Sequence, residues 1–367
     1  MAVNELLLAS SPHIVSPVQT RHLMTNVLIA LAPVTVFGVV LFGFSALLTI
    51  LVSIAAAVAG ENLFRRLSGK DIRIGDLSAV VTGLLLALVL PPSTPLWMTA
   101  LGAIFAVIVA KEFFGGLGAN VFNPALIGRA FLLMSFPAAL TTWHRPVGFA
   151  TSLTDAVSGP TPLRIIKAGE GLAGLGEDLA ASGLASSADY WPVMKTLFFG
   201  YHGGCIGETS ILLILAGAFY LLVTKTIDWR APAAMIAATF LGSALLGLDP
   251  LFTILSGGVL FGAVFMCTDY VSSPMTATGK LIFGAGAGII AVLIRKWGNY
   301  PEGVSYGILI MNAFTPFLNR LLQKKYGFVP KKKAPAENGP VPANSAPAVT
   351  AAAPRPGKAG ETGRAAE

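Results

Sequence analysis

The segment MTNVLIALAPVTVFGVVLF, residues 24–42, contains no charged side chain and is apolar almost throughout. A helix that crosses a bilayer needs about 20 mainly apolar residues. Similar segments follow near residues 44–63, 77–91, 96–113, 122–138, 208–224, 231–247, 251–269, 280–296 and 303–322. Several are short or interrupted by Gly and Pro, which is tolerated where neighbouring helices or cavities satisfy the freed backbone groups. The sequence therefore predicts about ten transmembrane helices.

The composition agrees with this class. The chain is 54% apolar and 12% charged, whereas a soluble domain carries about 25% charged residues. We predict an all-α polytopic membrane protein. The N-terminus has no basic stretch followed by a long apolar core, so no cleavable signal peptide is expected.

The positions of Lys and Arg predict which loops face the cytoplasm. The loops 65–76 and 225–230 and the tail around 331–333 are basic, so we expect both termini in the cytoplasm and residues 139–206 outside. Arg295 and Lys296 fall on the outer side. We expect them to extend to the interface or to pair with Glu302.

Two parts of the chain have similar spacings. Pro95 is followed 23 residues later by Gly118, and Pro274 is followed 24 residues later by Gly298. Each time a broken turn leads into an apolar helix, a Gly/Asn turn and a last helix. Because five spans is an odd number, the second copy would enter from the opposite side, which is an inverted repeat. The predicted domains are 1–23 (cytoplasmic N-terminal segment), 24–138 (first repeat), 139–206 (outer loop), 207–323 (second repeat) and 324–367 (disordered cytoplasmic tail).

Some function classes are excluded by composition. The net charge of +7 resides largely in the tail and one loop, and no basic patch is interleaved with aromatic residues, so nucleic-acid binding is not expected. Cys205 and Cys267 are too few to complete a four-ligand metal centre, and no histidine pair has metal-ligand spacing, so no metal site is predicted. The cysteines are interpreted as small buried residues, and a site shared with a partner chain stays open.

The polar run TDAVSGPTPL, residues 154–163, lies in the predicted outer loop. Pro162 disfavours the helical region for Thr161, and Pro160 fixes its own φ. We therefore expect the Thr161 hydroxyl on a stiff, extended and exposed segment. An ordinary turn between helices is the alternative, because Ser, Thr, Gly and Pro are typical turn residues.

Charged residues at membrane depth are costly and indicate an ion or proton path. Asp269, Glu208 and Glu112 are the candidates, and Asp269 is preferred because it precedes a broken segment. Alternatively, Lys111 and Glu112 pair with each other and the other acids cap helices at the interface.

The pattern D-x-x-S-G-x-T, formed by Asp155, Ser158, Gly159 and Thr161, resembles the flavinylation motif of the RnfD family, which supplies the D subunit of the Rnf complex. It also resembles that of the sister NqrB family, the B subunit of the Na⁺-translocating NADH:quinone oxidoreductase. Other stretches similar to the RnfD family are SPHIVSP (11–17), SAVVTGLLLALVLPP (78–92), FGGLGANVFNPALIGRAFLLMSFP (114–137), GGCIGETS (203–210), TDYVSSP (268–274) and YPEGVSYGILIMN (300–312). The family usually has alanine where this chain has Pro160.

This resemblance implies a multi-pass protein of the bacterial inner membrane that relays electrons across it, coupled to Na⁺ or H⁺ transport. It implies FMN joined through its phosphate to Thr161 by an FMN transferase on the periplasmic side. It also implies a partner subunit that carries a second FMN, and a non-covalent riboflavin beside Asn120 and Asn123. From the residues alone, Asn123 is an ordinary cap of the helix 122–138.

Two rival interpretations stay open at this stage. The first is the sister quinone-reducing complex, which shares the flavin and adds a quinone pocket. The second, suggested by the inverted repeat alone, is a solute channel or transporter without redox chemistry.

Overall fold

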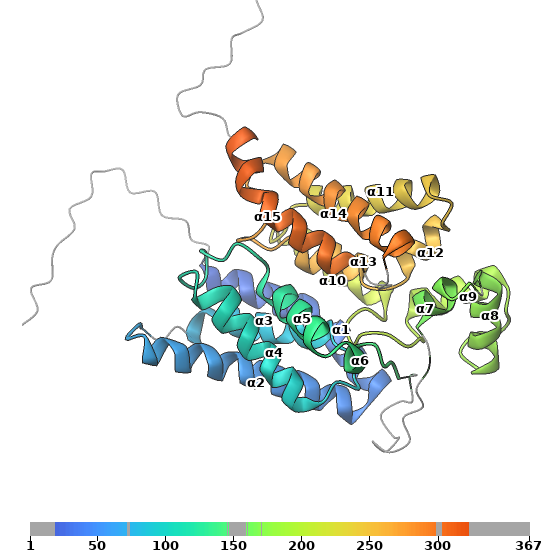
Figure 1. The fold of residues 1–367 in the computed structure, drawn as a ribbon, viewed down its shortest axis with the longest axis horizontal. Helices are drawn as coiled ribbons and strands as arrows, with labels where there is room; N and C mark the ends of the chain where they lie inside the picture. The colour runs from blue at the N-terminus through green and yellow to red at the C-terminus, as the bar shows by residue number, and fades with distance from the viewer. Residues whose placement is uncertain are drawn as a thin grey trace, which may run out of the picture. The chain divides into compact units, whose positions relative to one another are not determined.

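The computed structural model describes residues 19–71, 74–144, 146, 159, 161–169, 171–298 and 303–322. The regular elements within these ranges are all helices (Figure 1). The first group is α1 (Thr20–Phe42), α2 (Phe44–Leu67), η1 (Ile74–Asp76), α3 (Ser78–Leu88), α4 (Leu96–Val107), η2 (Ile108–Glu112), α5 (Pro124–Ser135) and α6 (Pro137–Leu140). The short helices α7 (Pro162–Lys167), α8 (Gly171–Ala181) and α9 (Tyr190–Phe199) follow. The last group is α10 (Ile211–Val223), α11 (Arg230–Leu245), α12 (Pro250–Leu255), α13 (Val259–Phe261), η3 (Gly262–Met266), α14 (Ala277–Trp297) and α15 (Val304–Leu322).

The predicted helical class is confirmed. Among the described residues, α1, α2 and α14 are long and apolar enough to cross a membrane, and α3, α5, α10 and α11 are shorter apolar helices. Each of the ten predicted segments contains helix, while the number that crosses the membrane stays a prediction. The segment 251–269 is broken rather than continuous, because Ser256 is extended and Gly257 has φ of +64°.

Several helix starts are set by side-chain caps. Asn123 accepts hydrogen bonds from the N–H groups that open α5, Asp249 does the same for α12, and Thr276 for α14. Each cap satisfies a backbone donor that has no partner within its helix. Pro124 and Pro250 then occupy the first helical positions, where a missing N–H costs nothing.

The two main groups of helices have a similar packing order. In the first, α2 packs against α3 and α4, and α4 packs against α5; in the second, α11 packs against α13, η3 and α14, and α14 packs against α15. Figure 1 shows α2, α3, α4 and α5 side by side, and likewise α11, α14 and α15. The groups meet where α1 contacts α10 and where α5 contacts α15.

Close approach in the second group depends on glycine. A Cβ at Gly284 of α14 would lie 2.2 Å from the carbonyl oxygen of Ala231 in α11, and one at Gly288 would lie 2.5 Å from that of Met235. Small residues let helix backbones approach closely, which is typical of packing between membrane helices.

The helices α7, α8 and α9 have a small core of their own. It consists of Ile165, Leu175, Leu179, Val193, Met194, Leu197 and Phe252. Because Phe252 belongs to α12, this core joins the middle segment to the second group of helices. The predicted segments 1–23 and 324–367 lie almost wholly outside the described residues.

Candidate functional site

Four charged side chains form an interior group that we call the ion-pair cluster: Glu61 and Arg65 from α2, and Lys111 and Glu112 from η2. Lys111 Nζ lies 3.0 Å from both carboxylate oxygens of Glu61, and Arg65 Nε lies 3.2 Å from Glu112 Oε1. Lys111 and Glu112 are each 1% exposed. The predicted pairing of Lys111 with Glu112 is wrong, because each pairs with α2. Two positive and two negative charges leave the cluster formally neutral.

The cluster is joined by hydrogen bonds to the loop that follows α2. Lys111 donates to Ser78 Oγ at 2.6 Å, and Ser78 Oγ donates to Asp76 Oδ1 at 2.7 Å. Arg65 donates to the carbonyl oxygen of Asp71 at 2.7 Å. Glu112 Oε2 is buried and has no hydrogen-bond partner among the described residues. A chain of polar groups therefore runs from the ion-pair cluster to the basic loop.

A cavity of about 50 Å³, which we call the central cavity, adjoins this cluster. Its lining includes Ser78, Lys111, Asn120, Asn123 and Asp269. The structure thus brings three of the predicted site residues together with Lys111. Since a water molecule needs roughly 10–15 Å³ of such space, the cavity suits a few waters or a small cation.

The two predicted flavin-binding amides differ in what they offer. Asn123 Oδ1 caps α5, accepting from the N–H groups of Ala125 at 3.0 Å and Leu126 at 3.3 Å. Asn120 donates to the carbonyl oxygen of Phe122 at 3.0 Å, and its Oδ1 is buried with no partner in the described part of the chain. The cap interpretation of Asn123 is therefore confirmed, and Asn120 keeps a free acceptor.

Asp269 connects this site to the second group of helices. Its Oδ2 accepts from Ser272 Oγ at 2.7 Å. The carbonyl oxygen of Ser272 in turn accepts from Thr315 Oγ1 at 2.9 Å. With its carboxamide oriented to satisfy both neighbours, Asn312 donates to Ser272 O at 3.2 Å and accepts from Asn123 N at 3.1 Å. The central cavity therefore lies where both groups supply polar side chains.

Glu208 belongs to a different place in the fold. It lies in the loop before α10, where its Oε1 accepts from the backbone N–H of Cys205 at 2.9 Å. The same loop hydrogen-bonds to the end of α3 through Gly207 N and Leu88 O at 2.7 Å. Cys205 and Cys267 are buried free thiols. Glu208 is not part of the central cavity lining.

The basic pair at the end of α14 departs from our expectation. Arg295 is 8% exposed and donates to the carbonyl oxygens of Thr253 at 2.5 Å and Ser256 at 3.0 Å. The predicted extension to the interface is therefore wrong for Arg295. Its guanidinium instead donates to the backbone carbonyl groups at the end of α12. Lys296 is exposed, and Glu302 lies outside the described residues.

Thr161 is the N-cap of α7. Its φ of −75° and ψ of 156° confirm the extended conformation predicted from Pro162, and its side chain accepts from Arg164 N at 3.3 Å. The predicted exposure is wrong, because Thr161 is 7% exposed. Gly159 donates its N–H to the carbonyl oxygen of Trp143 at 3.0 Å. Asp155 and Ser158 lie outside the described residues.

A cavity of about 410 Å³, which we call the α7 cavity, adjoins the helix that Thr161 begins. Leu163, Ile166 and Phe252 supply apolar walls, and Lys167 and Arg295 supply positive charge. This volume lies in the range of cofactor pockets. Asp249 also lines the cavity, and Thr161 itself does not. Apolar walls and cationic side chains of this kind suit a flat aromatic ring and an anionic phosphate.

The fold and these sites define a multi-pass helical membrane protein with ionisable groups in its interior. Residues 7–327 match the model of the NQR2, RnfD, RnfE family, and the chain belongs to that family.

Several curated relatives are similar over most of their length. The chain is 42% identical over 337 residues to the D subunit of the Na⁺-translocating ferredoxin:NAD⁺ oxidoreductase complex of Acetobacterium woodii, covering 90% of this chain and 99% of the relative. It is 42% identical over 332 residues to the proton-translocating counterpart of Clostridium ljungdahlii, covering 88% and 97%. The D subunit of the ion-translocating oxidoreductase complex of Stutzerimonas stutzeri is 40% identical over 326 residues, covering 83% and 92%. The resemblance to the RnfD family is thereby confirmed.

Proposed function

We propose that this protein is the membrane-embedded D subunit of an ion-translocating ferredoxin:NAD⁺ oxidoreductase complex. The observation that carries this proposal is the similarity, over nearly the full length, to relatives that bear this name. The protein is not a complete enzyme alone and acts with the other subunits of the complex. Its relatives are named for Na⁺ in one case and protons in another, so the coupling ion is either of these.

The flavin is proposed to be FMN, joined through its phosphate to the Oγ1 of Thr161. Bound there, it would supply reversible one- and two-electron redox chemistry. Thr161 holds the attachment point at the start of α7, and Arg164 offers positive charge within one turn. Leu163 and Ile166 line the adjacent cavity and exclude water from its apolar side. The remaining motif residues, Asp155 and Ser158, would be recognised by an FMN transferase.

The finer architecture is also proposed: ten membrane spans in two inverted repeats of five. The similar packing order of α2, α3, α4 and α5 and of α11, α13, α14 and α15 supports it. With the basic loops 65–76 and 225–230 in the cytoplasm, the α7 segment is periplasmic in a bacterial inner membrane. Thr161 then faces the side on which a partner subunit would carry its own FMN.

We propose that electrons and the coupling ion cross the membrane interior near the central cavity. Asn120 Oδ1, an acceptor without a partner within the described residues, is the group that would contact a second, non-covalent flavin. The cavity itself, of about 50 Å³, is too small to enclose such a ring. Asp269 and Asn120 offer oxygen atoms to a cation or proton. Lys111, paired with Glu61, lines the same cavity.

The attachment of FMN is tested by expressing the chain with an FMN transferase and measuring the intact mass and the in-gel fluorescence of denatured protein. We expect a covalent flavin on the wild type, none on Thr161→Ala, and full labelling of Thr142→Ala, a nearby exposed threonine. An unmodified wild-type mass would contradict the flavin proposal and favour the transporter. Label retained in Thr161→Ala would place the attachment elsewhere.

A further inference from the structure

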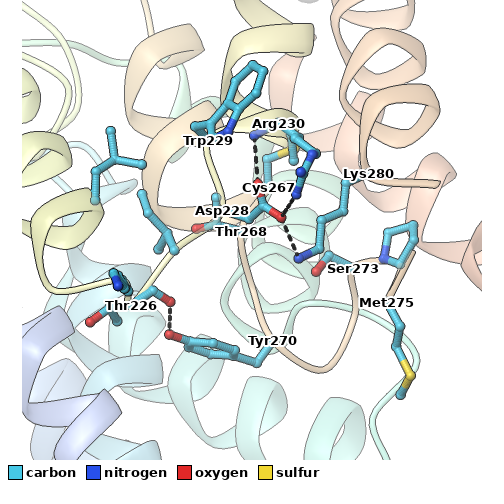
Figure 2. A pocket seen from close by; sticks show the side chains of 15 residues that line it. Thr226, Asp228, Trp229, Arg230, Cys267, Thr268, Tyr270, Ser273, Met275 and Lys280 are labelled. Carbon is cyan, nitrogen blue, oxygen red and sulfur yellow. Dashed lines mark hydrogen bonds and ion pairs between the residues drawn. The ribbon is translucent and has the colours of Figure 1, made fainter. Parts of the chain in front are cut away.

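A third cavity, of about 620 Å³, shares no lining residue with the two cavities described so far, and we call it the basic cavity. It is bounded by the end of α10, the turn 224–229, the start of α11, the turn 267–275 and the first turn of α14. Figure 2 shows Arg230 and Lys280 reaching toward the carboxylate of Asp228, with Trp229 beside them. None of these four residues lines the central cavity or the α7 cavity.

The charges in the basic cavity do not balance. Asp228 Oδ2 lies 2.9 Å from Arg230 NH1 and 3.1 Å from Lys280 Nζ, so one carboxylate serves two cations. Lys225 also lines the cavity and forms no ion pair with any residue that the structure describes. Three cations therefore face one anion. Such a lining favours a ligand that brings negative charge.

The rim of the basic cavity is apolar and exposed. Among its lining residues, Trp229 is 58% exposed, Leu222 is 40% exposed and Met275 is 86% exposed. Trp is enriched where a membrane protein meets the lipid head groups. The cavity thus combines a cationic interior with apolar side chains directed outward, which fits a molecule with an anionic head and hydrocarbon chains better than a soluble anion.

We propose that the basic cavity binds the phosphate head group of an anionic phospholipid. Lys225 and Arg230 bind the phosphate, and the acyl chains lie along Trp229 and Leu222. Basic pockets between transmembrane helices on the cytoplasmic side are a known place for such head groups. This lipid would fix the turn between α10 and α11 against the turn that follows η3. The proposal rests on the chain lying in a membrane and not on the flavin.

The test uses the full chain in nanodiscs that contain a small fraction of brominated phosphatidylglycerol, since bromine quenches tryptophan that it contacts. The contribution of Trp229 is the difference between the wild type and Trp229→Phe. We expect this contribution to be quenched more strongly by brominated phosphatidylglycerol than by brominated phosphatidylcholine. Equal quenching by the two lipids would overturn the proposal.

Charge variants separate this site from a general attraction to anionic lipid. We expect Lys225→Gln to weaken the preference for phosphatidylglycerol about fivefold, which is the change in affinity typical of losing one cation near an anionic membrane surface. The double variant Lys225→Gln/Arg230→Gln should weaken it further. Arg66→Gln removes an exposed cation from another basic loop and should leave the preference unchanged. Lys225→Gln breaks no ion pair among the described residues, so it keeps the test valid if the double variant fails to fold. An unchanged preference in Lys225→Gln would refute the site.

Two further arms identify the source of the phosphate. Excess inorganic phosphate at constant ionic strength should leave the quenching of Trp229 intact. If phosphate abolished the quenching, the cavity would bind a soluble anion instead of a lipid. In the assembled complex the preference should persist. Its loss there would show that a partner subunit covers the cavity.

Discussion

The ammonium nitrogen of Lys111 lies 3.0 Å from each carboxylate oxygen of Glu61, and both side chains are buried. Fifty positions separate the two residues in the chain. The pair ties η2 to α2 in the interior of the first group of helices. If Lys111 loses its charge, Glu61 keeps only a longer contact with Arg65 Nε, at 3.6 Å.

Lys111→Met should therefore be strongly destabilising. Breaking a buried pair by removing one partner costs about 3–5 kcal/mol, because Glu61 then keeps only its longer contact with Arg65 Nε, at 3.6 Å. The midpoint of denaturation in detergent measures the effect, and Lys195→Met, at an exposed lysine of α9, is the control. Lys111→Met combined with Glu61→Gln should recover part of the loss. A single variant as stable as the control would contradict the described pairing.

Two glycines between α11 and α14 should respond oppositely to alanine. At Gly284 a Cβ would lie 2.2 Å from Ala231 O, so Gly284→Ala forces the helices apart at a cost of about 1–3 kcal/mol. At Gly242 a Cβ would lie 3.7 Å from Val292, an ordinary contact. Gly242→Ala should be neutral or stabilising by up to about 1 kcal/mol, because alanine favours the helix. Thermal unfolding of both variants checks the pair, and equal shifts would argue against this packing.

Arg295 and Lys296 are adjacent cations with different roles. Arg295→Ala leaves the carbonyl oxygens of Thr253 and Ser256 without their donor, and we expect a loss of about 1.5–3 kcal/mol. Lys296→Ala removes an exposed charge and should change stability by less than about 0.5 kcal/mol. The denaturation midpoints of the two variants, measured against the wild type, test this difference. If Lys296→Ala proved the more harmful, the assignment of Arg295 as a cap of α12 would be wrong.

Asp228 should make stability depend on pH in acid. Burial acts to raise the pKa of Asp228, but hydrogen bonds from Arg230 N–H and Lys280, and then the Arg230 side chain, hold it below its ordinary value. A carboxylate with a lowered pKa stabilises the folded state above the pKa of the unfolded chain, and this contribution is lost as the pH falls. The difference in melting temperature between wild type and Asp228→Asn should be constant above about pH 5 and shrink below about pH 4. A difference that grows in acid would contradict this sign.

Local features of the sequence were sufficient for part of the molecule. Apolar runs indicated the helical segments, and Asn123 followed by Pro124 indicated the start of α5. The partners of Lys111 and Glu112 could not be predicted, because Glu61 and Arg65 lie about fifty residues earlier and come close only when α2 packs against η2. The burial of Thr161 depends in the same way on tertiary packing, which the flanking prolines do not report. The sequence predicts separate roles for Asn120 and Asp269, and only the fold shows that they share a cavity.

The π turn η2 makes this part of the chain sensitive to deletion of a residue. Successive residues of an α-helix point about 100° apart, yet Lys111 and Glu112 both point inward, as a turn widened by one residue permits. Deletion of one residue among positions 108–110 would shorten that turn to an ordinary helical turn and rotate Lys111 and Glu112 relative to α2. The pairing of all four charges thus depends on the one additional residue of the π turn, so a one-residue deletion that most loops tolerate would here leave a buried charge without its partner.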